Sequence, residues 1–338
     1  MRLLPPAALV KWRGAARCRH GIDYRRCNWY EVVVNQSDSS TVARRIGFIS
    51  AISAFTFWGI MPLYWTRIGM VPALEVLGHR ILWSGLLAWA IVLLRRFRVR
   101  RSGAPLTDPL MPRGRDLRWL LLGGFLVVVN WFFYVWAVSS GRTLDASLGY
   151  YINPLVSVLL GMVFLGERLS RLQWAALACA VGGVLFLTLR LGVFPWVSLV
   201  LAFTFGTYGL IKKRAIFPVI HSLAVEMVPF ILVALVFLGY LGRSGQGSFL
   251  AGSAVVSLLL WGAGAVSIAP LLLFAVATRR IRLADVGFLQ YIAPTMMFIL
   301  SVAVFRDPLE PARLTGFAFV WLGLVLYTIS NFRFRHKQ

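Results

Sequence analysis

The stretch from Arg142 to Leu169 recurs 140 residues later within a strongly apolar chain. The offset pairs Arg142 with Arg282, Asp145 with Asp285, Tyr151 with Tyr291, Ile152 with Ile292, Pro154 with Pro294, Leu160 with Leu300 and Leu169 with Leu309. A shorter echo, Ala-Phe-Thr-Phe, occurs at 54–57 and again at 202–205. Fixed-offset identity in such a chain predicts a duplicated membrane unit. Inverted copies build a site near the bilayer midplane that can open to either side.

Composition places the chain in a membrane. Hydrophobic residues make up 59% of its 338 residues, charged residues only 14%, and the mean hydropathy is +0.76. A net charge of +23 is typical of proteins that bind nucleic acid. Here the cations sit in short loops between apolar runs, so we interpret them as topology determinants and expect no nucleic acid. Cys18, Cys27 and Cys179 form neither a disulfide framework nor a zinc site.

Apolar runs of about 18 to 22 residues match the thickness of a bilayer. We predict an all-α polytopic protein with ten membrane helices, because an isolated spanning segment must satisfy its own backbone hydrogen bonds. The predicted spans are 46–66, 75–94, 118–138, 144–164, 172–189, 194–211, 224–241, 255–276, 284–304 and 312–331.

Cationic residues predict the orientation of these spans. Twenty-eight of the 35 Lys and Arg fall in the N-terminal stretch, alternate loops and the C-terminal tail, and six fall in the opposite loops. This asymmetry predicts that both termini lie in the cytoplasm. Five spans per repeat is an odd number, so the two repeats must be inverted. We expect repeats at 46–190 and 191–331 and a basic cytoplasmic tail at 332–338.

Residues 1–45 stand outside this architecture. Their first apolar stretch is short and broken by Pro5-Pro6, so it lacks the core of a signal peptide. The segment is rich in Arg and has little apolar periodicity. We interpret it as a disordered cytoplasmic extension or as an artefact of start-site assignment, and the sequence does not separate the two.

Charged groups inside a span are costly and are therefore candidates for function. Glu75 and His79 are four residues apart on one helix face, where they can hydrogen-bond to each other, and Arg80 follows. Histidine titrates most readily near neutral pH, so we interpret these three as coupling candidates, with Arg80 as partner or anion anchor. The alternative is a structural pairing at the membrane surface. Glu226 corresponds roughly to Glu75 in the second copy.

The fourth and ninth spans carry matched aromatic and proline residues. Proline frees a backbone carbonyl, and freed carbonyls at depth can line a path for a polar solute. We predict a central cavity shaped by the following residues of these spans: Tyr150, Tyr151, Asn153, Gln290 and Tyr291. Pro154 and Pro294 are the predicted hinges. The alternative is a hinge with packing tyrosines.

Three further polar or aromatic residues are predicted to line the same cavity. These are Trp58 in the first span and Asn130 and Trp131 in the third. A buried Asn equally serves as a link between helices. Small residues at Gly123-Gly124, Gly182-Gly183 and Gly323 predict close helix packing, with a homodimer surface as an alternative for the last two sites.

Several catalytic motifs are absent from the sequence. It contains no phosphate-binding loop, no His-Glu-x-x-His and no Gly-x-Ser-x-Gly. We therefore expect no ATP hydrolysis in this chain, no enzyme activity and no cofactor or metal.

Longer motifs resemble a known family. They are Val71-Pro72 with Glu75, His79-Arg80 and Trp83-Ser84; Asn130-Trp131; Ala146 to Val156; Leu165-Gly166-Glu167-Arg168-Leu169; and Gly287 to Phe298. Together they resemble the RarD-type branch of the EamA family, in the drug/metabolite transporter superfamily, across about 46–331. The resemblance implies ten helices in two inverted repeats, an inner-membrane location and secondary transport. The family begins near its first span, and it repeats a Gly-Glu pair where this chain has Arg306-Asp307-Pro308.

The sequence thus predicts a secondary transporter of small organic solutes, drugs or metabolites, that works by alternating access. We expect export, and we leave proton coupling open. The alternative is a non-transporting membrane sensor or scaffold, which would not depend on polar residues near the midplane.

Overall fold

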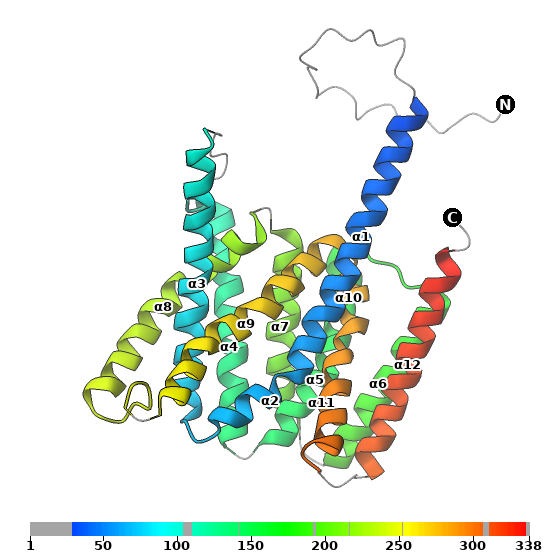
Figure 1. Ribbon diagram of the computed structural model, residues 1–338. Helices are drawn as coiled ribbons and strands as arrows, with labels where there is room; N and C mark the ends of the chain where they lie inside the picture. The colour runs from blue at the N-terminus through cyan, green and yellow to red at the C-terminus, as the bar shows by residue number, and fades with distance from the viewer. Residues whose placement is uncertain are drawn as a thin grey trace, which may run out of the picture. The chain divides into compact units, whose positions relative to one another are not determined.

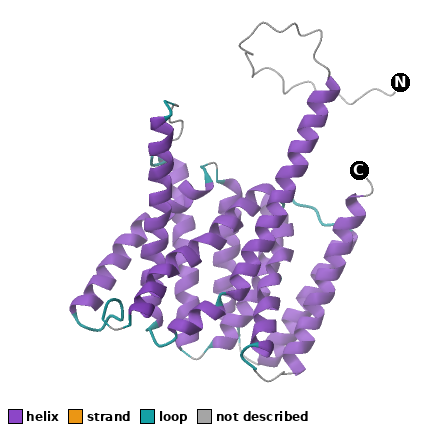
Figure 2. Ribbon diagram, in the orientation of Figure 1, coloured by secondary structure: helices purple, strands orange, loops and turns teal. Residues whose placement is uncertain are grey.

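Helices make up the fold of this chain (Figures 1 and 2). The computed structural model describes residues 29–338 apart from 104–109, 141, 192–193, 216, 252, 307–310 and 336–338. Within these residues there is no strand. The chain divides into two compact units, Met1–Ala43 and Arg44–Gln338. The described part of the first unit is helical from Trp29, and the second unit is a helical bundle.

The first half of the bundle follows the predicted spans closely. Its elements are α1 (Trp29–Ile60), α2 (Pro62–Trp65), the 3-10 helix η3 (Thr66–Ile68), α3 (Ala73–Arg101), α4 (Gly114–Ser139), α5 (Thr143–Leu165) and α6 (Arg171–Leu191). Helix α3 runs past its predicted end at residue 94, because its last turns carry arginines that extend the helix without a breaker until Gly103. Pro62 ends the regular hydrogen bonding of α1 and starts the short α2.

The second half has the same order of elements. They are α7 (Trp196–Arg214), α8 (Val219–Arg243), α9 (Ala254–Arg280), α10 (Leu283–Gln290), α11 (Ile292–Ala303) and α12 (Pro311–Arg335). The predicted ninth span is thus two helices that meet at Tyr291, three residues before Pro294. A proline cannot donate to the carbonyl four residues earlier, which accounts for a break at this point.

Eight of the described helical segments are long and apolar enough to cross a membrane. They correspond to α1 through η3, α3, α4, α5, α6, α8, α9 and α10 with α11. The protein is therefore an all-α, multi-pass membrane protein. Helices α7 and α12 lie where the sequence predicts the other two spans, but they are not among these eight. Ten spans in two inverted repeats stay a prediction.

The predicted N-terminal segment 1–45 overlaps the start of α1, which runs from Trp29 to Ile60. The stretch from Trp29 to the first span contains no Gly or Pro, so nothing interrupts a helix that continues out of the membrane segment. Residues 1–28 lie outside the described part of the chain, as do residues 336–338 of the predicted basic tail.

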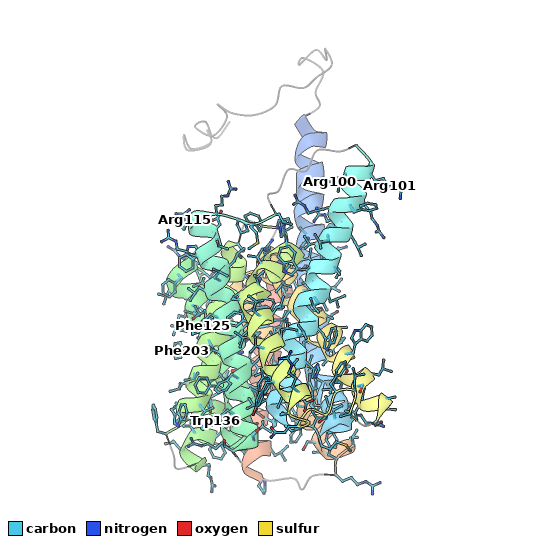
Figure 3. All side chains as sticks on the ribbon, turned by 90° about the vertical axis from the view of Figure 1, so that its left-hand side faces the viewer. Arg100, Arg101, Arg115, Phe125, Trp136 and Phe203 are labelled. Atoms are coloured by element: carbon cyan, nitrogen blue, oxygen red, sulfur yellow. The ribbon has the colours of Figure 1, made fainter. Side chains whose placement is uncertain are left out.

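Packing within the bundle joins elements from both halves of the chain. Helix α3 packs against α8 and α9, α5 against α7 and α10, and α6 against α12. The largest core contains Phe55, Leu82, Val127, Tyr208 and Phe274 from α1, α3, α4, α7 and α9. Outward-facing side chains are apolar too, as Phe125 and Phe203 show on one flank of the bundle (Figure 3). An apolar exterior is the surface that a bilayer solvates.

The predicted close-packing glycines lie at helix crossings within the chain. A methyl group added to Gly183 would stand 3.1 Å from the carbonyl of Gly316, and one added to Gly323 would stand 2.9 Å from the carbonyl of Ala176. Both contacts belong to the α6–α12 pair. These glycines therefore pack helices of the same molecule, as the small-residue pattern predicts.

Candidate functional site

A cavity lies among helices from both halves of the bundle. The space open to the centres of water molecules is about 100 Å³, and a single water needs about 10–15 Å³ of such space. The cavity therefore has room for several waters or a small organic molecule. Its lining residues are Phe55, Trp58, Met61, Pro62, Trp65, Arg80, Asn130, Trp131, Tyr134, Ala146, Gly149, Tyr150, Asn153, Leu201, Phe205, Gln290, Ala293 and Met297.

Helical periodicity explains which residues reach the cavity. On α5 the lining positions are 146, 149, 150 and 153, which is the spacing of a single helix face. Gln290, Ala293 and Met297 present the same kind of face from α10 and α11. Pro154 and Pro294 follow these faces. Each proline leaves the carbonyl four residues before it, at Tyr150 and at Gln290, without its helical donor.

Arg80 is the one charged side chain among the described lining residues. It is 8% exposed, and its Nε donates to Ser267 Oγ at 3.0 Å. Its guanidinium carbon lies 4.9 Å from the ring centre of Trp65 and 4.5 Å from that of Trp131, which are cation–π distances. The two indoles thus hold the cation in place from neighbouring helices.

Two amide side chains in the cavity have unused hydrogen-bonding capacity. Gln290 Oε1 accepts from Ser157 Oγ at 3.3 Å, while its Nε2 has no partner in the described structure. Asn153 Oδ1 is likewise buried without a partner there. Buried polar atoms are almost always paired, so unpaired ones in a cavity indicate positions where a bound molecule or water completes the site.

Asn130 combines the two roles that the sequence left open. Its Nδ2 donates to the carbonyl of Leu201 at 2.8 Å and to Thr204 Oγ1 at 3.1 Å, so it links α4 to α7. The same residue lines the cavity beside Trp131. These hydrogen bonds fix the part of α4 from which the neighbouring Trp131 contacts Arg80.

Tyr151 and Tyr291 were predicted to line the cavity, and the structure places both outside the lining. Tyr151 packs against Phe317, and Tyr291 donates from its hydroxyl to the carbonyl of Tyr151 at 3.1 Å. A methyl group added to Gly287 would lie 2.8 Å from the carbonyl of Pro154. The last two contacts belong to the crossing of α5 and α10, and the hydrogen bond from Tyr291 to Tyr151 joins residues that the 140-residue offset pairs.

Glu75 and His79 lie beside the cavity lining, not in it. The Glu75 carboxylate is 1% exposed and accepts three hydrogen bonds from the α8–α9 connection: Ser248 N at 2.6 Å, Ser248 Oγ at 3.0 Å and Phe249 N at 3.2 Å. His79 Nδ1 accepts from Trp83 Nε1 at 3.0 Å, so the proton of a neutral ring is on Nε2. His79 Nε2 lies 4.0 Å from Glu75 Oε1. In this arrangement Glu75 anchors a loop.

The structure contains a buried ion pair that sequence reasoning missed. Lys212 and Glu226 are both 0% exposed, and Lys212 Nζ lies 2.5 Å from Glu226 Oε1. Ser222 Oγ and the Tyr208 hydroxyl also donate to Glu226, at 3.0 and 3.4 Å. The predicted span 194–211 ends one residue before Lys212, which was therefore counted among the 28 cations of the predicted loops and chain ends; it is instead a buried residue in the last turn of α7. The short turn between α7 and α8 brings the Glu226 carboxylate to Lys212. The sequence could have indicated this pair, because two residues of opposite charge lie 14 positions apart.

Glu167 makes a second connection between the halves. Its two carboxylate oxygens each accept a backbone N–H at 2.7 Å, from Leu283 and from Ala284, at the start of α10. A carboxylate at a helix N-terminus satisfies free donors and complements the helix dipole. Burial by itself would lower the pKa of the neighbouring Arg282. The hydrogen bonds from the Arg282 guanidinium to Asp285 outweigh this effect, and the pKa of Arg282 is raised.

Comparison with known proteins decides the family. The EamA-like transporter family matches residues 45–189. The chain is 41% identical to the uncharacterized transporter YojE of Bacillus subtilis, over 86% of this chain and 96% of that protein. It is 40% identical to protein RarD of Streptomyces exfoliatus, over 86% and 90%, and 36% identical to protein RarD of Escherichia coli, over 85% and 95%. The chain belongs to the EamA-like transporter family.

Within that family the chain is of the RarD type, as the resemblance implied. Its relatives are named as transporters, a class without catalytic activity, so the protein is a membrane transporter and not an enzyme. A solved crystal structure covers 85% of this chain and 98% of its own with a TM-score of 0.61 and 21% identity. That likeness concerns the fold alone.

Proposed function

We propose that this EamA-family protein is a secondary transporter of small organic solutes and that the central cavity is its binding site. The observation that carries the proposal is the cavity itself, with an aromatic wall, one cation and two amide side chains that each have one buried atom without a partner in the described structure. Concave, mostly apolar sites with a few convergent polar groups are typical of small-molecule binding. The absence of a phosphate-binding loop from the sequence favours gradient-driven transport.

Alternating access between two inverted repeats is the proposed mechanism. Three helix pairs that would be equivalent in the two repeats pack against each other: α3 with α8, α5 with α10, and α6 with α12. A pseudo-twofold axis through the bundle would produce this pattern of contacts. The hydrogen bond from Tyr291 to the Tyr151 carbonyl supports the same arrangement, because it joins residues at the repeat offset.

The proposed orientation has both chain ends in the cytoplasm of a bacterium, with the protein in the inner membrane. Helix α1 enters the bundle on the side where α12 ends (Figure 1). Arg100, Arg101 and Arg115 lie at that end, and Trp136 lies at the opposite end (Figure 3). An excess of cations at one face favours that face as cytoplasmic. Export is the proposed direction.

The connection made by Glu167 is a contact that such a movement would have to break. It joins the end of α5, in the first predicted repeat, to the start of α10, in the second. Arg282 Nη1 adds a hydrogen bond to the carbonyl of Arg168 at 3.2 Å across the same junction. We place the closed gate of this conformation here.

Proton coupling through Glu75, His79 and Arg80 is a proposal of its own. Protonation of His79 at Nδ1 requires Trp83 to release that nitrogen, and protonation of Glu75 weakens its hold on the α8–α9 connection. A proton could thereby loosen the loop. The double variant Glu75→Gln with His79→Ala tests this: pH-gradient dependence should disappear. Unchanged transport with unchanged gradient dependence would remove the coupling role.

The cavity itself is tested by Asn153→Ala and Gln290→Ala, measured as solute flux into inverted membrane vesicles. Both changes remove amide groups without leaving a buried charge, so both variants should insert into the membrane normally. The amount of folded protein in the vesicles serves as the control. Flux should fall in both variants. Full flux in both, at normal protein levels, would remove the cavity from the transport path. A sensor or scaffold predicts no flux in any variant or in the wild type.

A further inference from the structure

Arg80 lacks a carboxylate partner in the described part of the chain, although it is only 8% exposed. The other Lys or Arg there that is less than a tenth exposed, Lys212, has Glu226 at 2.5 Å. In the described part of the chain, Arg80 has a single protein hydrogen bond, from Nε to the neutral hydroxyl of Ser267. Glu75 lies on the same helix, but its carboxylate is occupied by Ser248 and Phe249.

The surroundings of Arg80 hold the cation without neutralising it. Trp65 and Trp131 provide cation–π contacts, which orient the guanidinium but leave its full positive charge. A buried charge without a counter-ion is unfavourable at membrane depth, and polar groups of this kind mark substrate sites. The terminal nitrogens of Arg80 have no protein acceptor among the described residues, and the residue lines the cavity.

We infer that the substrate of this transporter is an organic monoanion, a carboxylate on an aromatic or similarly flat body, whose charge binds Arg80. This inference rests on the proposed function, because it assumes that the cavity is the transport site. A guanidinium matches a carboxylate with two parallel hydrogen bonds. The charge count argues for a monoanion, since a dianion would leave one negative charge uncompensated in an apolar site.

The remaining wall matches the body of such a molecule. Trp58, Tyr134, Tyr150 and Phe205 line the cavity and present ring faces or edges suited to a planar solute. Gln290 Nε2 offers one further donor, and Asn153 Oδ1 offers an acceptor for an N–H or O–H group on the solute. A cationic amine would meet Arg80 as a like charge and is rejected by this site.

The experiment compares three solutes that share one ring and differ in charge. Indole-3-acetate, indole-3-acetamide and tryptamine carry one negative, no and one positive charge. Uptake of each radiolabelled solute is measured in proteoliposomes that contain the purified full-length protein, with protein-free liposomes to subtract passive entry. We expect flux of the carboxylate to exceed that of the amide on the order of tenfold or more, as for a charge-assisted pair over a neutral one, and no flux of the amine.

Arg80→Gln and Arg80→Lys separate charge from folding. Because Arg80 has no carboxylate partner, its neutralisation leaves no orphaned buried charge, and the unliganded Gln variant should melt at or above the wild-type temperature. Indole-3-acetate should raise the melting temperature of the wild type and of the Lys variant, but not that of the Gln variant. The Gln variant should also lose the preference for carboxylate over amide.

Each outcome of this test bears on the inference. Equal or greater flux of the amide or the amine in the wild type would overturn it and leave the transporter function intact. A preference for the carboxylate that survives in Arg80→Gln would also overturn it. The absence of flux of all three solutes would overturn the inference and weigh against the proposed function as well.

Discussion

Removal of Lys212 alone should destabilise the protein strongly. Lys212 and Glu226 are fully buried, and Lys212 provides the one cationic hydrogen bond recorded to that carboxylate among the described residues. In Lys212→Met, Glu226 keeps only the neutral donors Ser222 and Tyr208. Loss of one partner from a buried ion pair costs about 3–5 kcal/mol, because the other charge stays desolvated. We expect a loss in that range for the free energy of unfolding.

The double variant Lys212→Met with Glu226→Leu gives the sharper prediction. Replacement of both charges by apolar groups removes the orphaned carboxylate, so most of the single-variant loss should be recovered, to within about 1–2 kcal/mol of the wild type. The coupling energy between the two sites is this recovery, at least about 1 kcal/mol, plus the loss measured in Glu226→Leu alone.

The assay is equilibrium unfolding of the purified protein in mixed micelles with increasing SDS, followed by helical circular dichroism. Arg243→Met is the matched control, since Arg243 is exposed at the end of α8 and its loss should change stability by no more than about 0.5 kcal/mol. A loss below about 1 kcal/mol in Lys212→Met would refute the reasoning. So would a double variant whose loss equals the sum of the two single losses.

Two further predictions concern helix contacts. Gly124→Ala would place a methyl group 2.2 Å from the carbonyl of Glu226, so the α4–α8 crossing must shift. The melting temperature should therefore fall by several degrees. The control is Gly239→Ala, which has nothing within 4 Å of the added carbon and should leave the melting temperature unchanged. Glu167→Gln removes the charge that caps α10, which should cost about 1 kcal/mol of stability in the same unfolding assay and make the proposed gate open more often. A Glu167→Gln protein of wild-type stability and wild-type flux would contradict the gate.

Much of the fold could be predicted from the sequence, because bilayer thickness fixes the length of an apolar span. Eight of the predicted spans coincide with described helices that are long and apolar enough to cross a membrane, and the break at Tyr291 lies three residues before the predicted hinge Pro294. What the sequence could not supply is the packing of these helices. Lys212 was interpreted as a loop cation because its partner, Glu226, lies on another helix and only the tertiary fold joins them.

The cavity was predictable in part. Polar residues stand out in apolar spans, so Arg80, Asn130, Asn153 and Gln290 could be selected by type alone. Apolar and aromatic lining residues, such as Phe55, Trp65 and Met297, carry no such signal, because these helices are apolar on every side.

The choice between Tyr150 and Tyr151 depends on helix rotation. Consecutive residues point about 100° apart on a helix, and only Tyr150 shares a face with Ala146, Gly149 and Asn153. This spacing of small and polar residues could have favoured Tyr150 before the structure was known. Tyr151 instead offers its carbonyl to Tyr291 at the repeat crossing, a contact that only the fold defines.

The most direct test of transport through the central cavity is solute flux in proteoliposomes of the purified protein. The solutes are amphenicols, amino acids and related metabolites, each measured with and without an imposed pH gradient, beside Asn153→Ala as the cavity variant. We predict saturable flux of at least one solute class in the wild type, reduced in the variant, with collapse on dissipation of the gradient where protons are coupled. Folded wild-type protein that moves no solute under any gradient would contradict the account.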